Sequence, residues 1–201
     1  MPWKPWTSFL GSHWTYTQQN RDSCGPCCVM MTIRKLTNVV LSERDAFLAY
    51  DSYGNPTEYS NPDGVVIREY DGSVYTFADR LARTLRNLIG NAKAFNASSQ
   101  HVGKLIKSSL GKGYPMIGLV SWSGGGGHFV LIDGGKAWSN GTYYMSVCDP
   151  WDGELRLVPL PASGPVTYTP DYPALIKNQG STGGGANNGT FNGWVVKLYP
   201  D

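Results

Sequence analysis

This chain of 201 residues has no long apolar run and carries little charge. None of its hydrophobic stretches approaches the roughly 18 residues of a membrane-spanning helix. Charged residues make up 16% of the sequence, and the formal net charge is +2. A charge this small gives no basis for attraction to nucleic acid or to an anionic bilayer. We therefore expect no membrane span and no nucleic-acid partner.

The sequence also lacks a secretory leader and a disulfide framework. Its first residues, Met1–Trp6, contain no apolar core of a signal peptide. Of its four cysteines, Cys24, Cys27 and Cys28 are clustered, which is a poor pattern for structural disulfides. We expect a cytoplasmic protein, or one that is exported by a machine that needs no signal peptide.

The remaining composition is that of an ordinary globular protein. Hydrophobic residues make up 41% of the chain, and this length is enough to bury a substantial core. No internal repeat is present. We expect one domain over residues 1–201, made of an N-terminal arm over 1–17, a helical lobe over 18–111 and a β lobe over 112–201.

Apolar residues at helical spacing predict four helices in the first half of the chain. They cover about residues 24–36, 42–50, 76–89 and 99–110. The side chains expected to face the core in the first and third of these helices are Val29, Ile33, Leu36, Phe77, Leu81, Leu85 and Leu88.

The periodicity then changes to that of strands separated by glycine-rich turns. Strands are predicted over 114–122, 128–133, 142–149, 154–160 and 193–199. Two segments are predicted to be loops: 51–75, which is rich in Gly, Asn, Asp, Pro and Tyr, and 178–190, which is rich in Gly, Asn and Ser. Helices followed by an antiparallel sheet indicate an α+β fold.

Cys24 has the context of a nucleophile. A thiol attacks a carbonyl as the thiolate, which a helix N-terminus and a neighbouring imidazolium both favour. Cys24 opens the first predicted helix, and Pro26 is well tolerated in a first helical turn. An amide donor for a developing oxyanion is available just upstream, at Gln18.

His128 and Asp149 are candidates for the groups that assist the thiol. His128 opens an apolar strand, and Asp149 ends the next one. If the two strands form a hairpin, these residues lie near opposite positions, and the acid orients the imidazole. Asp133 and Asp152 are the competing acids. Asp133 is expected on the other face of the strand, and Asp152 in a solvated turn.

Together these motifs resemble the papain-like cysteine peptidase superfamily and, within it, the bacteriocin-processing, C39-like bacterial branch. That branch has a glutamine six residues before Cys-Gly-Pro, then a G-x-P strand, a G-H strand and a D-P strand end. The matching residues are Gln18, Cys24–Pro26, Gly113–Ile117, Gly127–Ile132 and Asp149–Pro150. The resemblance covers about residues 18–160.

Two positions differ from papain itself. Papain uses the second cysteine of its motif, which corresponds to Cys27 here. Six residues before Cys27 stands Arg21, which is no amide donor, so the spacing favours Cys24. Gln19 is adjacent to Gln18, and a one-residue bulge would present it instead.

The resemblance implies a papain-like fold with the nucleophile at a helix N-terminus, packed on an antiparallel sheet. It implies a cysteine peptidase in which Cys24 attacks, His128 transfers protons, Asp149 orients His128 and Gln18 stabilises the oxyanion. No cofactor and no metal are implied. The substrate is a protein or peptide, and a bacterial effector or toxin would also have a cognate inhibitor or immunity protein.

Other functions remain open at this point. Acyl transfer or deamidation uses the same acyl-thioester route. Cys24–Cys27 has the spacing of a dithiol oxidoreductase, although no apolar strand precedes it. A zinc site built from Cys24, Cys27, Cys148 and a histidine lacks a second close ligand pair. An inactive papain-like module that only binds is the last alternative.

Overall fold

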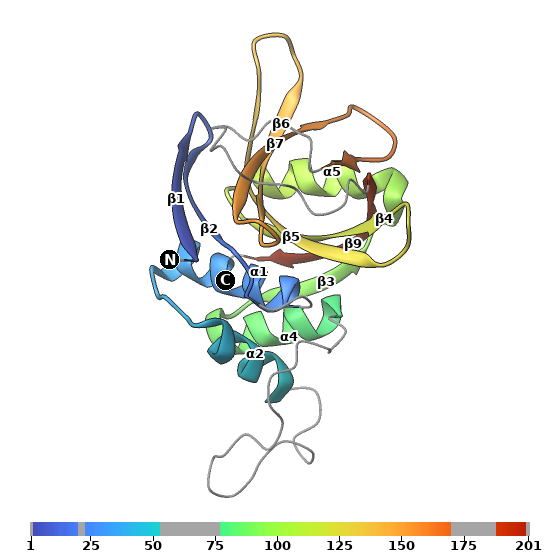
Figure 1. Cartoon of the computed structure of the whole chain (residues 1–201). Helices are drawn as coiled ribbons and strands as arrows, with labels where there is room; N and C mark the ends of the chain where they lie inside the picture. The colour runs from blue at the N-terminus through green and yellow to red at the C-terminus, as the bar shows by residue number, and fades with distance from the viewer. Residues whose placement is uncertain (1, 20–22, 53–76, 170–187, 200–201) are drawn as a thin grey trace, which may run out of the picture.

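The computed structural model describes residues 2–19, 23–52, 77–169 and 188–199. Within them the chain forms helices and antiparallel strands, in the arrangement seen in Figure 1. The predicted α+β class is therefore confirmed. The predicted loops over 51–75 and 178–190 lie almost entirely outside the described residues.

All four predicted helices are present within a few residues of their expected bounds. They are α1 (Cys24–Thr37), α2 (Glu43–Ser52), α4 (Ala78–Ile89) and α5 (Ser98–Leu110). None of these described helices is both long and apolar enough to cross a membrane.

The predicted inward faces are wrong at three positions, because Leu36, Phe77 and Leu88 are largely exposed. Each lies in the last turn of its helix or just outside it. The first ten residues of α1, in contrast, are buried on all sides. This is the pattern of a central helix rather than of a surface helix with one apolar stripe.

The described strands include the five that the sequence predicts and four that it does not. The predicted strands are β4 (Met116–Trp122), β5 (Gly127–Ala137), β6 (Tyr143–Asp149), β7 (Glu154–Leu160) and β9 (Gly189–Leu198). The additional strands are β1 (Trp3–Ser8), β2 (Gly11–Tyr16), β3 (Ala92–Asn96) and β8 (Thr167–Tyr168).

The main sheet has the strand order β3-β9-β4-β5-β6-β7, with β8 paired to β9, while β1 and β2 form a separate hairpin. In Figure 1, α1, α2 and α4 lie on one side of this sheet and α5 lies on the other. The sheet therefore contributes to two cores. Strand β9 lies between β3 and β4, although it follows both in sequence.

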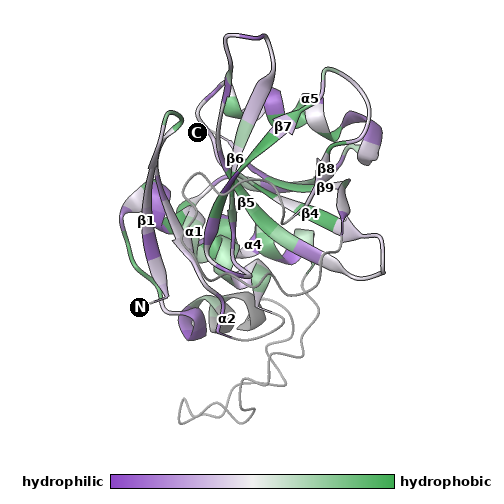
Figure 2. Cartoon of the chain, turned by 45° about the horizontal axis from the view of Figure 1, so that its top comes forward, coloured by the Kyte–Doolittle hydropathy of each residue, from purple (hydrophilic) through white to green (hydrophobic). Residues whose placement is uncertain are grey.

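Strand β5 has an apolar side chain on both faces of the sheet. Phe129 and Leu131 belong to the core that contains α1, and Val130 and Ile132 belong to the core that contains α5. Hydrophobic colouring in Figure 2 accordingly gathers where the central strands meet. A strand buried on both faces gives a continuous apolar run rather than an alternating one.

The β1–β2 hairpin is bound to the turn that follows β6. Thr15 Oγ1 donates a hydrogen bond to the Gly153 carbonyl (2.6 Å), and the Gln18 N–H donates to the Pro150 carbonyl (2.7 Å). Gly153 has a positive φ of 68°, and a Cβ built on it would overlap Thr17 Oγ1. The close approach of the two segments therefore requires glycine at this position.

We expect Gly153→Ala to lower the free energy of unfolding by roughly 2–3 kcal/mol, from backbone strain and steric overlap together. Gly164 is the matched control, because it also has a positive φ but no atom lies near its Cβ position. Gly164→Ala should cost about 1 kcal/mol, from backbone strain alone. Urea unfolding of both variants checks the difference, and equal losses would contradict the close-packing explanation.

Candidate active site

Cys24 is the first residue of α1 and the most accessible of the four cysteines. Its side chain is 9% exposed, and those of the other three are fully buried. The first backbone N–H groups of a helix have no partner within the helix and carry partial positive charge. The Phe129 N–H donates to Cys24 Sγ at 3.5 Å. The sulfur thus lies between the helix N-terminus and the start of β5.

His128 lies beside Cys24 and reaches Asp149 with its other side. Its Nε2 is 2.7 Å from Asp149 Oδ1, and the ring lies close enough to Cys24 for that residue to raise the pKa of the imidazole. Because Nε2 is bound to Asp149, the ring nitrogen left for Cys24 is Nδ1. One imidazole therefore joins two groups that are 125 residues apart in the sequence.

The surroundings of His128 favour its charged form. Burial alone would lower its pKa, but the negative charge of Asp149, the hydrogen bond to that carboxylate and the Cys24 hydrogen bond raise the pKa from 6.5 to about 10. The imidazole is therefore protonated at neutral pH. An imidazolium next to a thiol favours the thiolate.

Asp149 is buried and accepts hydrogen bonds on both oxygens. Oδ1 accepts from His128 and from the Trp151 N–H (2.9 Å), and Oδ2 accepts from the Tyr168 hydroxyl. Arg156 Nη1 lies 3.3 Å from Oδ2. Burial alone would raise the pKa of Asp149, but the charge and hydrogen bond of His128, then Arg156 and Tyr168, hold it well below its ordinary value.

From the sequence, His128 and Asp149 were expected near opposite positions of a hairpin. The register of β5 and β6 shows that the two residues are offset along the strands. The last paired residues of β5 and β6 are Leu131 and Cys148. Asp149 follows Cys148 directly, whereas His128 lies three residues beyond Leu131. The two side chains are diagonal neighbours, a separation that an aromatic ring can bridge.

Neither competing acid contacts His128. Asp133 accepts a hydrogen bond from His13 Nδ1 at 2.7 Å, on the α1 side of the sheet. The sequence predicted Asp152 to be solvated, and this is wrong. Its carboxylate is only 14% exposed and forms a two-point ion pair with Arg156.

Sequence inspection did not identify Tyr168 and Arg156 as site residues. Both are buried, and both contact the Asp149 carboxylate. Tyr168 lies in a two-residue strand with no recognisable motif. An arginine among the leucines and valine of β7 was the one available signal, because a charge in an apolar strand requires a partner.

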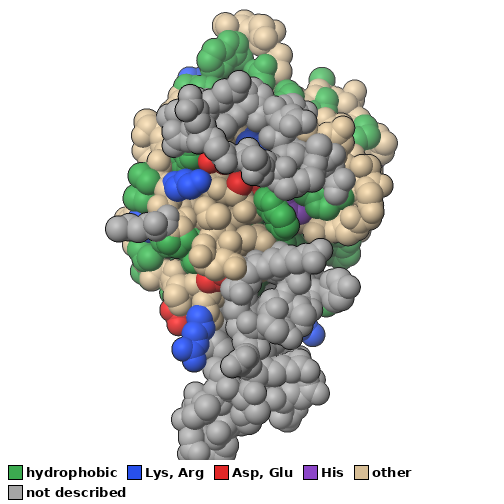
Figure 3. All heavy atoms as spheres, viewed as in Figure 1, with side chains coloured by type: hydrophobic (Ala, Val, Ile, Leu, Met, Phe, Trp, Pro, Cys, Tyr) green, Lys and Arg blue, Asp and Glu red, His purple; other side chains and the backbone are tan. Residues whose placement is uncertain are grey.

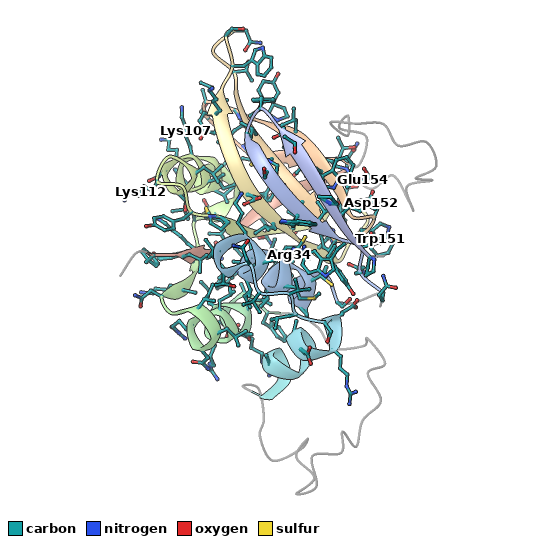
Figure 4. All side chains as sticks on the ribbon, turned by 90° about the vertical axis from the view of Figure 1, so that its left-hand side faces the viewer. Arg34, Lys107, Lys112, Trp151, Asp152 and Glu154 are labelled. Atoms are coloured by element: carbon teal, nitrogen blue, oxygen red, sulfur yellow. The ribbon has the colours of Figure 1, made fainter. Side chains whose placement is uncertain are left out.

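Two indole rings border the imidazole of His128. Trp122 stacks on it with ring centres 5.7 Å apart, and Trp151 meets it edge-on at 6.3 Å. Trp151 is nearly half exposed. Figure 4 shows it with Asp152 and Glu154 along one edge of the sheet, and Figure 3 shows hydrophobic side chains gathered beside a histidine on one face. An apolar surface therefore adjoins the imidazole.

The two candidate amide donors lie in different surroundings. The Gln18 backbone is bound to Pro150, next to Asp149, and its side chain is partly buried. The Gln19 side chain is exposed and donates to the Thr17 carbonyl at 2.7 Å. Arg21, at the corresponding distance before Cys27, lies outside the described residues.

The other three cysteines are unsuited to react with a substrate. Burial raises the pKa of Cys27, Cys28 and Cys148 well above the ordinary thiol value. Cys27 Sγ also lies within hydrogen-bonding distance of Ser23 Oγ, at 3.7 Å. A protonated thiol without access to solvent is a poor nucleophile.

One group of side chains in the described part of the chain has the donor set of a metal site. Potential ligand atoms of His13, Asp133 and Cys148 all lie within 4.8 Å of one another. However, the Lys35 ammonium lies 3.3 Å from Asp133 Oδ2. The carboxylate therefore already faces a positive charge, and it serves the His13 hydrogen bond. This set includes Cys148 and a histidine, as did the zinc ligands considered from the sequence, but it contains neither Cys24 nor Cys27.

No known family model matches the chain, and no curated protein matches its sequence.

The elevated pKa of His128 makes its contribution to stability depend on pH. The folded protein holds this proton up to about pH 10, whereas in the unfolded chain it leaves near pH 6.5. The stabilisation is therefore complete below about pH 6.5 and is lost as the pH rises towards 10. Between these limits the loss is on the order of 1 kcal/mol per pH unit.

We expect the difference in unfolding free energy between wild type and His128→Gln to shrink as the pH rises from about 7 to about 9. Urea unfolding across this range measures it. In an Asp149→Asn background, the same comparison should depend much less on pH. A wild-type advantage that stays constant with pH would show that His128 is not held in its charged form.

Proposed function

We propose that this chain is a cysteine peptidase with a papain-like fold, in which Cys24, His128 and Asp149 act as a triad. The observation that carries this function is the position of His128, which is hydrogen-bonded to Asp149 through Nε2 and lies next to Cys24. The nucleophile begins a buried helix, and the other two residues come from adjacent antiparallel strands. The ordered motifs that resemble the papain-like superfamily lie at these same positions.

In the proposed reaction, the Cys24 thiolate attacks the carbonyl carbon of a peptide bond. A C–S bond forms while the carbonyl electron pair moves to oxygen. The Gln18 side-chain amide and the Cys24 backbone N–H donate to this oxyanion. As the tetrahedral intermediate collapses, His128 gives its proton to the departing amine, leaving a thioester on Cys24.

Water completes the cycle. His128, now neutral, takes a proton from a water molecule as that water attacks the thioester. Collapse of the second tetrahedral intermediate releases the carboxylic acid, restores the thiolate and leaves the imidazole protonated. Asp149 keeps the imidazole oriented and stabilises its charged form throughout. These steps need neither a metal nor an organic cofactor.

An acyl transferase or deamidase would share these steps and differ in the group attacked or in the group that accepts the acyl chain. The dithiol oxidoreductase is less well supported, because Cys27 is buried and its pKa is raised. For the peptidase, the proposed substrate is a protein or peptide. An effector or toxin role, with a cognate inhibitor, is the biological setting that we propose.

A peptidyl epoxide should label wild-type protein once, on Cys24, because this thiol combines accessibility with a neighbouring imidazolium. Cys24→Ala should abolish labelling and hydrolysis of a peptide mixture. Cys27→Ala is the matched control, one helical turn away, and should keep labelling while losing stability. Mass spectrometry of the labelled peptide checks the site, and modification of Cys27 in the wild type would overturn the assignment.

Asp149→Asn should lower kcat on the order of a hundredfold or more, because an amide can hold the wrong imidazole tautomer. Asp133→Asn is a matched control, since Asp133 also lies 2.7 Å from a histidine nitrogen, but away from Cys24. That variant should lose stability and keep its kcat once folded. Steady-state kinetics at matched folded fractions separates the two, and equal losses of kcat would refute the role of Asp149.

A further inference from the structure

Glu43, the first residue of α2, binds two residues of the segment that joins β2 to α1. Its Oε2 accepts a hydrogen bond from the Gln19 N–H at 2.8 Å. Its Oε1 accepts one from the Ser23 hydroxyl. Glu43 and Ser23 are both buried. One carboxylate from another helix therefore holds the residue after Gln18 and the residue before Cys24.

Tyr16 also lies near this carboxylate. Burial, followed by the negative charge of Glu43, raises the pKa of Tyr16 well above the ordinary phenol value, and a hydrogen bond to Glu43 adds to the shift. Tyr16 is the last residue of β2. The carboxylate that binds Gln19 and Ser23 thus also lies near the end of β2.

The hydroxyl of Ser23 is used in an unusual way. Ser23 is the N-cap residue of α1, where serine side chains commonly bond the first helical N–H groups, yet it makes no such cap bond. Its hydroxyl is directed to Glu43 instead. Hydrogen bonds to a buried carboxylate are strong and costly to break. The hydrogen bond to Glu43 therefore fixes Ser23 more firmly than an ordinary N-cap hydrogen bond would.

We infer that Glu43 is a positioning residue that sets Gln18 relative to Cys24, so that both donors meet the oxyanion. This inference rests on the proposed function. Displacement of a donor by about 1 Å is enough to slow a reaction strongly. Glu43 does not touch the substrate, and it acts through the two residues that it holds.

Two reagents that modify Cys24 distinguish a role of Glu43 in positioning the oxyanion donors from a general effect of Glu43 on the reactivity of the thiol. Iodoacetamide alkylates the sulfur by displacement at a saturated carbon, with loss of iodide, and forms no oxyanion. p-Nitrophenyl acetate acylates it through a tetrahedral oxyanion, which collapses to acetyl-Cys24 and p-nitrophenolate. Only the second rate depends on Gln18 and the Cys24 N–H being in position.

In Glu43→Gln we expect p-nitrophenolate release in the first turnover to be slower by about tenfold or more, with iodoacetamide alkylation changed by less than about twofold. Asp45→Asn is the matched control on the same helix. Asp45 is exposed and forms a capping pair with Ser42 at the start of α2. Its loss weakens α2 without removing the bonds of Glu43, so the ratio of the two rates should stay at the wild-type value.

Ser23→Ala removes the Ser23 hydrogen bond to Glu43 and keeps the carboxylate. This variant tests the positioning role if Glu43→Gln folds poorly. Ser23→Ala should lower the ratio of the p-nitrophenyl acetate rate to the iodoacetamide rate, by a smaller factor than Glu43→Gln does. A normal ratio in both variants, or an equal fall of both rates, would overturn the positioning role. If wild-type Cys24 is not acylated at all, the proposed function itself fails, and the two failures are distinguishable.

Discussion

The ion pair between His128 and Asp149 is the interaction on which the rest of the site depends. Both residues are almost fully removed from solvent, and burying two charges costs more than their mutual attraction returns unless further hydrogen bonds satisfy them. Here the Tyr168 hydroxyl and the Trp151 N–H supply those bonds. Arg156 adds positive charge on the far side of the carboxylate and is itself balanced by Asp152. The stacked ring of Trp122 shields the imidazole from water.

Cys24 and the His128–Asp149 pair are held by different parts of the molecule. Cys24 belongs to the core on the α1 side of the sheet, whereas Tyr168, the partner of Asp149, belongs to the core on the α5 side. Cys24 and the His128–Asp149 pair meet at the start of β5, where the Phe129 N–H reaches the sulfur. The turn after β6 then holds Gln18 through Pro150. Small errors in either core would therefore shift one reacting group relative to another.

Much of this arrangement was predictable from local signals. The apolar spacing gave the four helices, and Asn140-Gly141 marked the hairpin that joins β5 to β6. Cys24, His128 and Asp149 were predicted from residue type and order, and the structure brings them together. The β1–β2 hairpin was missed, because prolines and tryptophans mask its alternation, and Ala92–Asn96 was missed because it follows a helix stop with little apolar character.

The contacts that the sequence could not give are those between distant segments. Arg156 and Tyr168 lie in different strands, and no spacing relates either of them to Asp149. Asp152 looks like a solvated turn residue until the position of Arg156 is known. In the sequence, Glu43 has the position of an ordinary acidic residue in the first turn of α2. Its contacts with Gln19 and Ser23 are visible only in the folded chain. Long-range charge pairing leaves no periodic signature in a single sequence.

The position of β9 has a consequence for biosynthesis. This strand lies between β3 and β4, yet it follows every other described strand in sequence. A nascent chain in which Cys24, His128 and Asp149 have already left the ribosome still lacks an inner strand of its sheet. Pairings of such high sequence separation form late. A chain interrupted during translation before Leu198 would thus leave the ribosome without a completed sheet.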